Sequence, residues 1–169
     1  LKNIKEIKEF NIGHYLIGES IFHGLSKVIN NFKRIIIDWK LMKILGIGVD
    51  IVQNKRIKNL VKNKSFISRT FSNNEIKFSK KILNKTGYFS KRFAAKESLA
   101  KSLGTGFRDN LNFKDIEIFN DKKGKPFFNR SRHIDEIIYK KFKVRKYNLF
   151  LSISDEKDYS IAFTTLQSK

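Results

Sequence analysis

The sequence predicts an α+β domain with a mainly antiparallel sheet, and three observations support this class. Stretches that alternate like strands stand between stretches with helical spacing of apolar residues. The last two alternating stretches, residues 148–155 and 158–166, are joined by a turn at Asp155–Lys157, which requires antiparallel pairing. After residue 41 no linker or repeat interrupts the chain, and its 169 residues, 40% of them hydrophobic, suffice for one core.

The elements in the first half of this domain follow from local patterns. Residues 42–52 alternate as a strand, and residues 54–63 have helical spacing. Ser72 and Glu75 form a capping-box pattern, which starts a helix that we expect to end near Leu83.

The second half is organised around a long helix. Residues 87–103 give the strongest helical pattern of the chain, and Gly104 and Gly106 end it. Residues 113–119 alternate as a strand, and a turn over residues 121–126 leads to a short strand at Phe127. Residues 131–142 then form a helix before the closing hairpin.

The first strand has one face that is almost bare. Leu45, Ile47, Val49 and Ile51 share a face, because side chains alternate along a strand, and we expect that face to be buried. Gly46, Gly48 and Asp50 share the opposite face. We expect the two glycines to leave space for a ligand beside the Asp50 carboxylate.

Residues 1–40 form a basic extension with few acids and no clear strand alternation. One interpretation is the remnant of an organelle-targeting sequence. The alternative is one or two extra helices packed on the domain, since Leu16/Ile17, Ile21, Leu25 and Ile29 recur at near-helical spacing. Residues 41–169 would be the functional domain under either interpretation.

Composition limits the kinds of site and partner. The chain has no cysteine, its three histidines are scattered, and no apolar run is long enough to span a bilayer. The net charge of +20 favours an acidic partner, such as nucleic acid, a membrane surface, a phosphorylated ligand or an acidic protein. A codon bias towards lysine is an equally good explanation, so charge alone does not select a partner.

Three charged residues could form a catalytic site. Lys101 follows Glu97 by one helical turn, and this spacing alone is typical of an exposed helix pair. If Asp50 meets Glu97 where the strand packs on the helix, the two carboxylates could bind Mg²⁺, which prefers oxygen ligands and retains several waters. A metal held between two carboxylates and a substrate phosphate is suited to phosphoryl transfer.

A series of motifs carries a family resemblance. In order they are GIGVDIV at 46–52, KRI at 55–57, FSNNE at 71–75, RFAAKESLAKSLGTGF at 92–107, FNDKKGKP at 119–126 and LSISDEKDYSIA at 151–162. Together they resemble the holo-acyl-carrier-protein synthases, the small class of 4′-phosphopantetheinyl transferases. The resemblance covers about residues 43–166.

The resemblance implies an activity and a set of roles. The family transfers 4′-phosphopantetheine from coenzyme A to a serine of apo-acyl-carrier protein in fatty-acid biosynthesis, with Mg²⁺, and releases adenosine 3′,5′-bisphosphate. Asp50 and Glu97 match its metal ligands, and Lys101 matches a lysine at the pyrophosphate. The base for the serine would be Glu97 or a water on the metal. The segments that match coenzyme contacts contain Arg92, Lys101, Gly104, Thr105 and Gly106.

The resemblance also implies partners. Arg56 matches an arginine that docks the acidic carrier protein, and Lys55, Lys58 and Lys62 could assist by electrostatic steering. The family assembles as a homotrimer with each site at a subunit boundary, and a plastid is the expected organelle if the extension is an address. Asp155 stands where many relatives have a histidine that contacts the coenzyme.

A competing function class is a non-enzymatic nucleic-acid-binding domain. The +20 charge and the many aromatic residues favour it. No recognised RNA- or DNA-binding motif is present, and most of the 16 phenylalanines occupy core-like positions, so we expect neither a nucleic-acid partner nor membrane insertion.

Overall fold

A computed structural model describes residues 13–41, 43–108 and 110–169, and the chain divides into two compact units. The boundary between the units lies between Lys43 and Ile44. Helices α1 (Gly13–His23) and α2 (Leu25–Leu41) belong to the first unit, and Gly24, with φ +80°, joins them. The second unit spans Ile44–Ser168.

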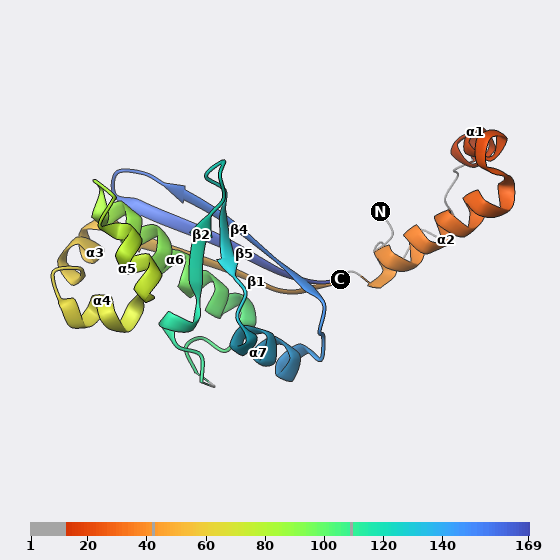
Figure 1. Cartoon of the computed structure of the whole chain (residues 1–169). Helices are drawn as coiled ribbons and strands as arrows, with labels where there is room; N and C mark the ends of the chain where they lie inside the picture. Colours follow the sequence, from red (N-terminus) through yellow and green to blue (C-terminus); the bar gives the residue numbers. More distant parts are fainter. Residues whose placement is uncertain (1–12, 42, 109) are drawn as a thin grey trace. The chain divides into compact units, whose positions relative to one another are not determined.

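The second unit is built on a three-stranded antiparallel sheet. Its strands are β1 (Ile44–Gln53), β4 (Tyr147–Asp155) and β5 (Tyr159–Ser168), in the order β1–β5–β4 (Figure 1). Helix α6 (Lys85–Leu103) packs across β1 and β5. The α+β class, with an antiparallel sheet on a long helix, is therefore confirmed.

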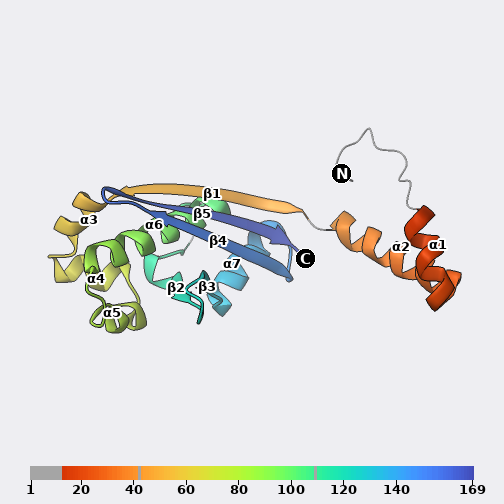
Figure 2. The same cartoon turned by 90° about the horizontal axis from the view of Figure 1, so that it is seen from above.

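The remaining elements lie on one side of this sheet (Figure 2). They are α3 (Asn54–Leu60), α4 (Lys64–Thr70), α5 (Asn73–Ser79), the 3₁₀ turn η1 (Phe113–Asp115), the hairpin β2 (Glu117–Asn120) and β3 (Pro126–Asn129), and α7 (Arg132–Phe142). None of the described helices is both long enough and apolar enough to cross a membrane.

Three element boundaries differ from the sequence prediction. The helix expected over residues 54–63 ends earlier, and Asn63 caps a separate helix, α4, by accepting a hydrogen bond from the Ser65 amide (2.8 Å). Helix α5 ends at Ser79 rather than near Leu83. The segment expected to be a strand from residue 113 begins with the 3₁₀ turn, and β2 starts only at Glu117.

The predicted capping box is present and is part of a larger buried cluster. Ser72 Oγ accepts a hydrogen bond from the Glu75 amide (3.2 Å), and Glu75 Oε2 accepts one from the Ser72 amide (2.9 Å). The same carboxylate forms an ion pair with Lys96 of α6 (2.8 Å), and both side chains are almost fully buried.

Lys96 extends this cluster to the segment before β2. Its amino group also donates to the carbonyls of Phe113 (2.9 Å) and Ile116. Burial lowers the pKa of Lys96, while the Glu75 carboxylate opposes that shift. The ion pair therefore fixes the position of α6 relative to α5 and β2.

The two faces of the sheet are the reverse of the sequence expectation. Ile47, Val49 and Ile51 are 55%, 54% and 60% exposed, so three of the four residues expected to be buried face outward. Leu45, beside a register shift at the start of β1, is partly buried against the core as expected. The glycine face packs on α6: a Cβ on Gly46 would lie 1.9 Å from the Ser102 carbonyl oxygen, and one on Gly48 would lie 1.9 Å from that of Ser98.

This contact corrects the expected role of the glycines. They leave no free space for a ligand, because the backbone of α6 fills the positions that their side chains would occupy. Strand β5 shows the same pattern, with Ala162 and Thr164 buried and Ile161 and Phe163 exposed. Small residues face the helix, and the sheet presents large apolar residues on its outer face.

Candidate functional site

The structure brings Asp50 and Lys101 together where β1 crosses α6. Asp50 shares the inner face of β1 with the two glycines and is half-buried. Lys101 Nζ lies 2.8 Å from Asp50 Oδ1, and the Lys101 side chain is about half exposed. The lysine therefore forms its ion pair across the strand–helix contact, in addition to lying one turn after Glu97.

Glu97 belongs to the same charged cluster. Burial raises the pKa of its carboxyl group, and the negative charge of Asp50 raises it further. The positive charges of Lys101 and Arg56 lower the pKa of the same group, by less. The four residues predicted from the sequence as catalytic or docking groups, on β1, α3 and α6, are thus electrostatic neighbours.

The carboxylate oxygens of this cluster suit a hard divalent cation that takes only some of its ligands from the protein. Asp50 and Glu97 supply two carboxylates, and their mutual repulsion is what a cation would relieve. No group of three or more His, Cys, Asp or Glu side chains within the described ranges could hold a metal ion. Two protein carboxylates with further oxygens from substrate and water are the usual surroundings of Mg²⁺.

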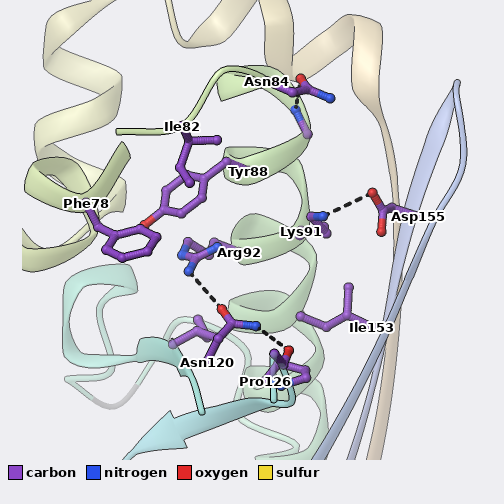
Figure 3. Close-up of a pocket in the computed structure, with 13 residues that line it drawn as sticks. Phe78, Ile82, Asn84, Tyr88, Lys91, Arg92, Asn120, Pro126, Ile153 and Asp155 are labelled. Atoms are coloured by element: carbon purple, nitrogen blue, oxygen red, sulfur yellow. Dashed lines mark hydrogen bonds and ion pairs between the residues drawn. The ribbon is translucent and has the colours of Figure 1, made fainter. Parts of the chain in front are cut away.

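A second feature is a cavity of about 440 Å³ that contains Arg92 (Figure 3). Its walls come from α5, α6, the β2–β3 hairpin and β4. They include Phe78, Ile82, Asn84, Tyr88, Lys91, Arg92, Ile118, Asn120, Pro126, Ile153 and Asp155. Apolar walls with a few cationic groups are typical of a small-molecule site.

The Arg92 side chain is only 6% exposed, and two neighbours fix its position in the cavity wall. Its guanidinium group stacks 3.6 Å above the Tyr88 ring and donates to Asn120 Oδ1 at 3.3 Å (Figure 3). Burial lowers the pKa of Arg92. Its Nε is buried without a hydrogen-bond partner and lies 4.0 Å from Glu75 Oε1, so the guanidinium group also forms an ion pair with the buried carboxylate.

Lys91 and Asp155 form an ion pair on the opposite side of the cavity (Figure 3). Lys91 Nζ lies 3.1 Å from Asp155 Oδ2, and both side chains are partly exposed. A neighbouring hollow of about 600 Å³ shares Asp155 with the cavity and is also lined by Lys55 and Lys58. Lys157, Glu156 and Asp158 also line this hollow, so charges of both signs lie between the cavity and α3.

The glycine loop after α6 lies apart from this cavity. Gly104 ends the helix as predicted, with φ +65°, and Gly106 has φ +59°. Thr105 lines a different hollow, with Ile137, Lys140 and Lys141 of α7. The residues expected to contact the coenzyme therefore fall into three groups: Arg92 in the cavity, Lys101 in the charged cluster, and residues 104–106 after the C-terminal end of α6.

The geometry of α6 separates the charged cluster from the cavity within one chain. Arg92 and Glu97 are five residues apart, which corresponds to about 140° around a helix and about 7.5 Å along it. Tyr88 lies one turn before Arg92 and lines the same cavity. Sequence reasoning missed Tyr88, Lys91 and Asn120; the spacing of Tyr88 and Arg92 was the only local signal.

Comparisons with known proteins define the class first. The family model of the 4′-phosphopantetheinyl transferase superfamily matches residues 46–164, which contain both the charged cluster and Arg92.

Curated relatives then give the family. A holo-[acyl-carrier-protein] synthase of Pelagibacter ubique is 59% identical over 128 residues, which cover 76% of this chain and 100% of the relative. The corresponding enzyme of Clostridium tetani is 42% identical over an alignment that covers 75% of this chain and 98% of the relative. The chain belongs to the holo-[acyl-carrier-protein] synthase family of phosphopantetheinyl transferases, and it is an enzyme.

Solved structures show the same fold. The holo-[acyl-carrier-protein] synthase of Neisseria meningitidis matches with a TM-score of 0.67 and 36% identity, over 73% of this chain and 98% of that chain. The Bacillus anthracis enzyme, in complex with CoA (3′,5′-ADP), matches with a TM-score of 0.63 and 33% identity, over 75% and 98%. A Helicobacter pylori enzyme in complex with coenzyme A matches with a TM-score of 0.60 and 31% identity, over 71% and 98%.

The extension has a separate similarity. The family model of the pyridoxal phosphate biosynthesis protein PdxJ matches residues 1–38. Residues 1–12 lie outside the described part of the structure, so only the remainder of this match can be compared with α1 and α2.

Proposed function

We propose that this enzyme transfers 4′-phosphopantetheine from coenzyme A to a serine of apo-acyl-carrier protein in fatty-acid biosynthesis and releases adenosine 3′,5′-bisphosphate. The cluster of Asp50, Glu97 and Lys101 at the β1–α6 contact is the observation that carries this proposal. The family match supports it and disfavours a non-enzymatic nucleic-acid-binding domain.

Each residue of the cluster has a role in this reaction. Asp50 and Glu97 would hold Mg²⁺, which when bound neutralises negative charge on the attacked phosphate. Lys101 can move from Asp50 to the pyrophosphate and offset charge on the leaving group, because its side chain is exposed and flexible. The proton of the serine hydroxyl would pass to Glu97 or to a water held by the metal.

The Arg92 cavity is the proposed site for the nucleotide part of coenzyme A. Phe78, Ile82 and Tyr88 give it apolar surface for a base, while Arg92 and Lys91 supply positive charge for phosphates. A related enzyme has been solved in complex with coenzyme A, which supports this ligand.

The proposed active site lies between two subunits of a homotrimer. Within one chain the Arg92 cavity and the Glu97 cluster lie on different sides of α6, so a neighbouring copy is needed to bring them to one substrate. The neighbouring copy could pack on the outer face of the sheet, which presents exposed apolar side chains. Those of Ile47, Val49, Ile161 and Phe163 are between 39% and 55% exposed. Apolar surface of this kind is typical of protein interfaces.

The carrier protein would approach through α3. Arg56 contributes positive charge at Glu97, and Lys55 and Lys58 line the hollow that adjoins the Arg92 cavity. Complementary charge mainly accelerates encounter with an acidic partner. Arg56→Glu should therefore raise KM for the carrier far more than KM for coenzyme A, and added salt should reduce the difference.

A direct assay tests the proposed reaction. The enzyme is mixed with coenzyme A, Mg²⁺ and an apo-acyl-carrier protein, and the carrier is weighed by mass spectrometry. We expect a gain of one phosphopantetheine group, lost on chelation of the metal and in the Glu97→Gln variant. A carrier of unchanged mass with the native enzyme, or full activity of Glu97→Gln, would contradict the proposal.

Mixed oligomers test the shared active site. Arg92→Ala and Glu97→Gln should each be inactive alone. After joint refolding, random trimers should regain about a quarter of the native activity, because some boundaries combine an intact Arg92 with an intact Glu97. No recovery, although mixed trimers are detected by native mass spectrometry, would place both groups in one subunit's site.

The location of the enzyme in the cell remains a prediction. A plastid location depends on residues 1–40 being the remnant of a targeting sequence. The similarity of residues 1–38 to a second enzyme family supports a different origin for this segment.

A further inference from the structure

The α1–α2 unit leaves most of its described apolar side chains uncovered. Ile17, Ile21, Phe22 and Leu25 are 66%, 76%, 82% and 56% exposed. Val28, at 5%, is the buried apolar side chain among those described in this unit. Ile17 and Ile21 are one turn apart on α1, so they share a helix face, and Phe22 extends it.

Two helices of this length do not make a stable domain alone. They contain 11 and 17 residues, and helices of this size depend on packing of an apolar face against other elements. Chains below about 40 residues rarely bury enough surface to fold without a partner. The exposed surface formed by Ile17, Ile21 and Phe22 of α1 and Leu25 at the start of α2, here called the α1 face, therefore requires a cover.

The identity of the cover follows from the extent of the PdxJ similarity. That match ends at residue 38, within α2, just before the unit boundary at Lys43 and Ile44, while the transferase match begins only at residue 46. The PdxJ-like segment thus coincides with the helical unit. We propose that residues 1–38 are a piece of a PdxJ-type domain, and that the α1 face packs against the rest of such a domain.

A binding experiment tests the surface and its occupant together. The probe is a separately encoded PdxJ-family protein from which the segment corresponding to residues 1–38 has been deleted, mixed with the full chain. Size-exclusion chromatography with light scattering should show a complex with the deleted protein. The intact PdxJ-family protein should not bind, because its own segment occupies the place.

Matched variants identify the face. In the full chain, the double variant Ile21→Ser and Phe22→Ser should weaken this complex at least tenfold, whereas Lys27→Gln, at an exposed polar position of α2, should not change it. Transferase activity should be unchanged in all three chains. A complex that tolerates the double variant, a failure to bind, or self-association of the chain through the same residues would overturn the proposal.

A chimaera provides a readout if the deleted protein does not fold. In this chimaera, residues 1–38 of the present chain replace the corresponding segment of an intact PdxJ-family protein. The chimaera should fold and keep the enzymatic activity of the PdxJ-family protein. The same chimaera with Ile21→Ser and Phe22→Ser should have a clearly lower melting temperature. A chimaera that cannot fold, or one whose melting temperature is unchanged by the double variant, would contradict the inference.

Discussion

Glu97 is surrounded by charges of both signs, and these act on its protonation in opposite directions. Burial and Asp50 raise the pKa of its carboxyl group, whereas Lys101 and Arg56 lower it. A carboxylate in such a position is sensitive to the loss of any neighbour. The environment of Glu97 can therefore be measured without substrate.

The first prediction concerns the titration of Glu97 in metal-free enzyme. Asp50→Asn should lower the pKa of Glu97, because it removes a negative charge and releases Lys101 from its ion pair. Lys101→Met should raise it. NMR titration of the Glu97 carboxyl carbon measures both shifts, and equal pKa values in the native enzyme and both variants would show that these charges are not neighbours.

The sign of this shift also gives an effect on stability. The folded-state pKa of Glu97 lies above its unfolded value, so folding favours the protonated carboxyl group. Glu97 therefore opposes folding increasingly as pH rises from its unfolded pKa through its folded pKa. Asp50→Asn should reduce this loss, which denaturation curves across that window can detect.

The second prediction concerns Lys101. Its ion pair with Asp50 is half exposed on the lysine side, so Lys101→Ala should cost less than about 1 kcal/mol of stability. If Lys101 balances charge on the leaving group, the same change should lower kcat by about 10²-fold. Arginine should rescue only part of the activity, because its planar group replaces a compact charge.

Lys77→Ala is the matched control for that experiment. Lys77 is an exposed lysine on α5, outside the charged cluster. It should alter neither kcat nor KM for coenzyme A. An unchanged kcat in Lys101→Ala would reduce Lys101 to a surface ion pair.

At the scale of elements, the contact between β1 and α6 determines where the carboxylates lie. The alternation of β1 correctly grouped Asp50 with Gly46 and Gly48, because a two-residue period assigns residues to faces. It did not reveal which face is buried. The helix approaches the glycine face so closely that side chains are excluded, and large residues consequently face outward.

The third prediction uses this close contact. Gly48→Ala would place a methyl group 1.9 Å from the Ser98 carbonyl oxygen, so α6 must move away from β1. We expect a loss of about 1–3 kcal/mol or more in the free energy of unfolding, together with most of the activity. Gly18→Ala, where no atom lies within 4 Å, should leave both unchanged, and equal behaviour of the two variants would refute the close contact.

Local patterns predicted elements better than they predicted the spatial environment of the site. The capping box at Ser72 and the glycine that ends α6 are both local, and both are confirmed. The Glu75–Lys96 ion pair joins residues 21 positions apart in sequence, so no local pattern could indicate it. Arg92 was expected from the family pattern, but its cavity depends on five elements that only the fold brings together.

At the scale of the whole molecule, the packing of α6 on the glycine face of β1 leaves large apolar side chains on the outer face of the sheet. Val49 and Phe163 are register partners on β1 and β5, and both point outward. A face of this kind is costly to leave in water. In a homotrimer it would be covered.

The fourth prediction therefore addresses assembly. Phe163→Lys should give a folded monomer with little activity, because the side chain is already 45% exposed in one chain but lies on the proposed subunit contact. Leu83→Lys, at a fully exposed apolar position off the sheet, should keep both assembly and activity. Sedimentation and the carrier assay measure the two properties, and an active monomer would exclude a site shared between subunits.

The glycine contact between β1 and α6 also has a dynamic consequence. Where backbone meets backbone, no side chain can change rotamer to let the helix slide, and Ser98 of α6 is additionally tied to Thr164 of β5 by a 2.6 Å hydrogen bond. Opening there requires separating the helix from the sheet. The amide hydrogens of residues 98–102 should therefore exchange with deuterium only as fast as the whole second unit unfolds. On this expectation, Asp50 and Glu97 stand beside the segment of the fold that exchanges most slowly.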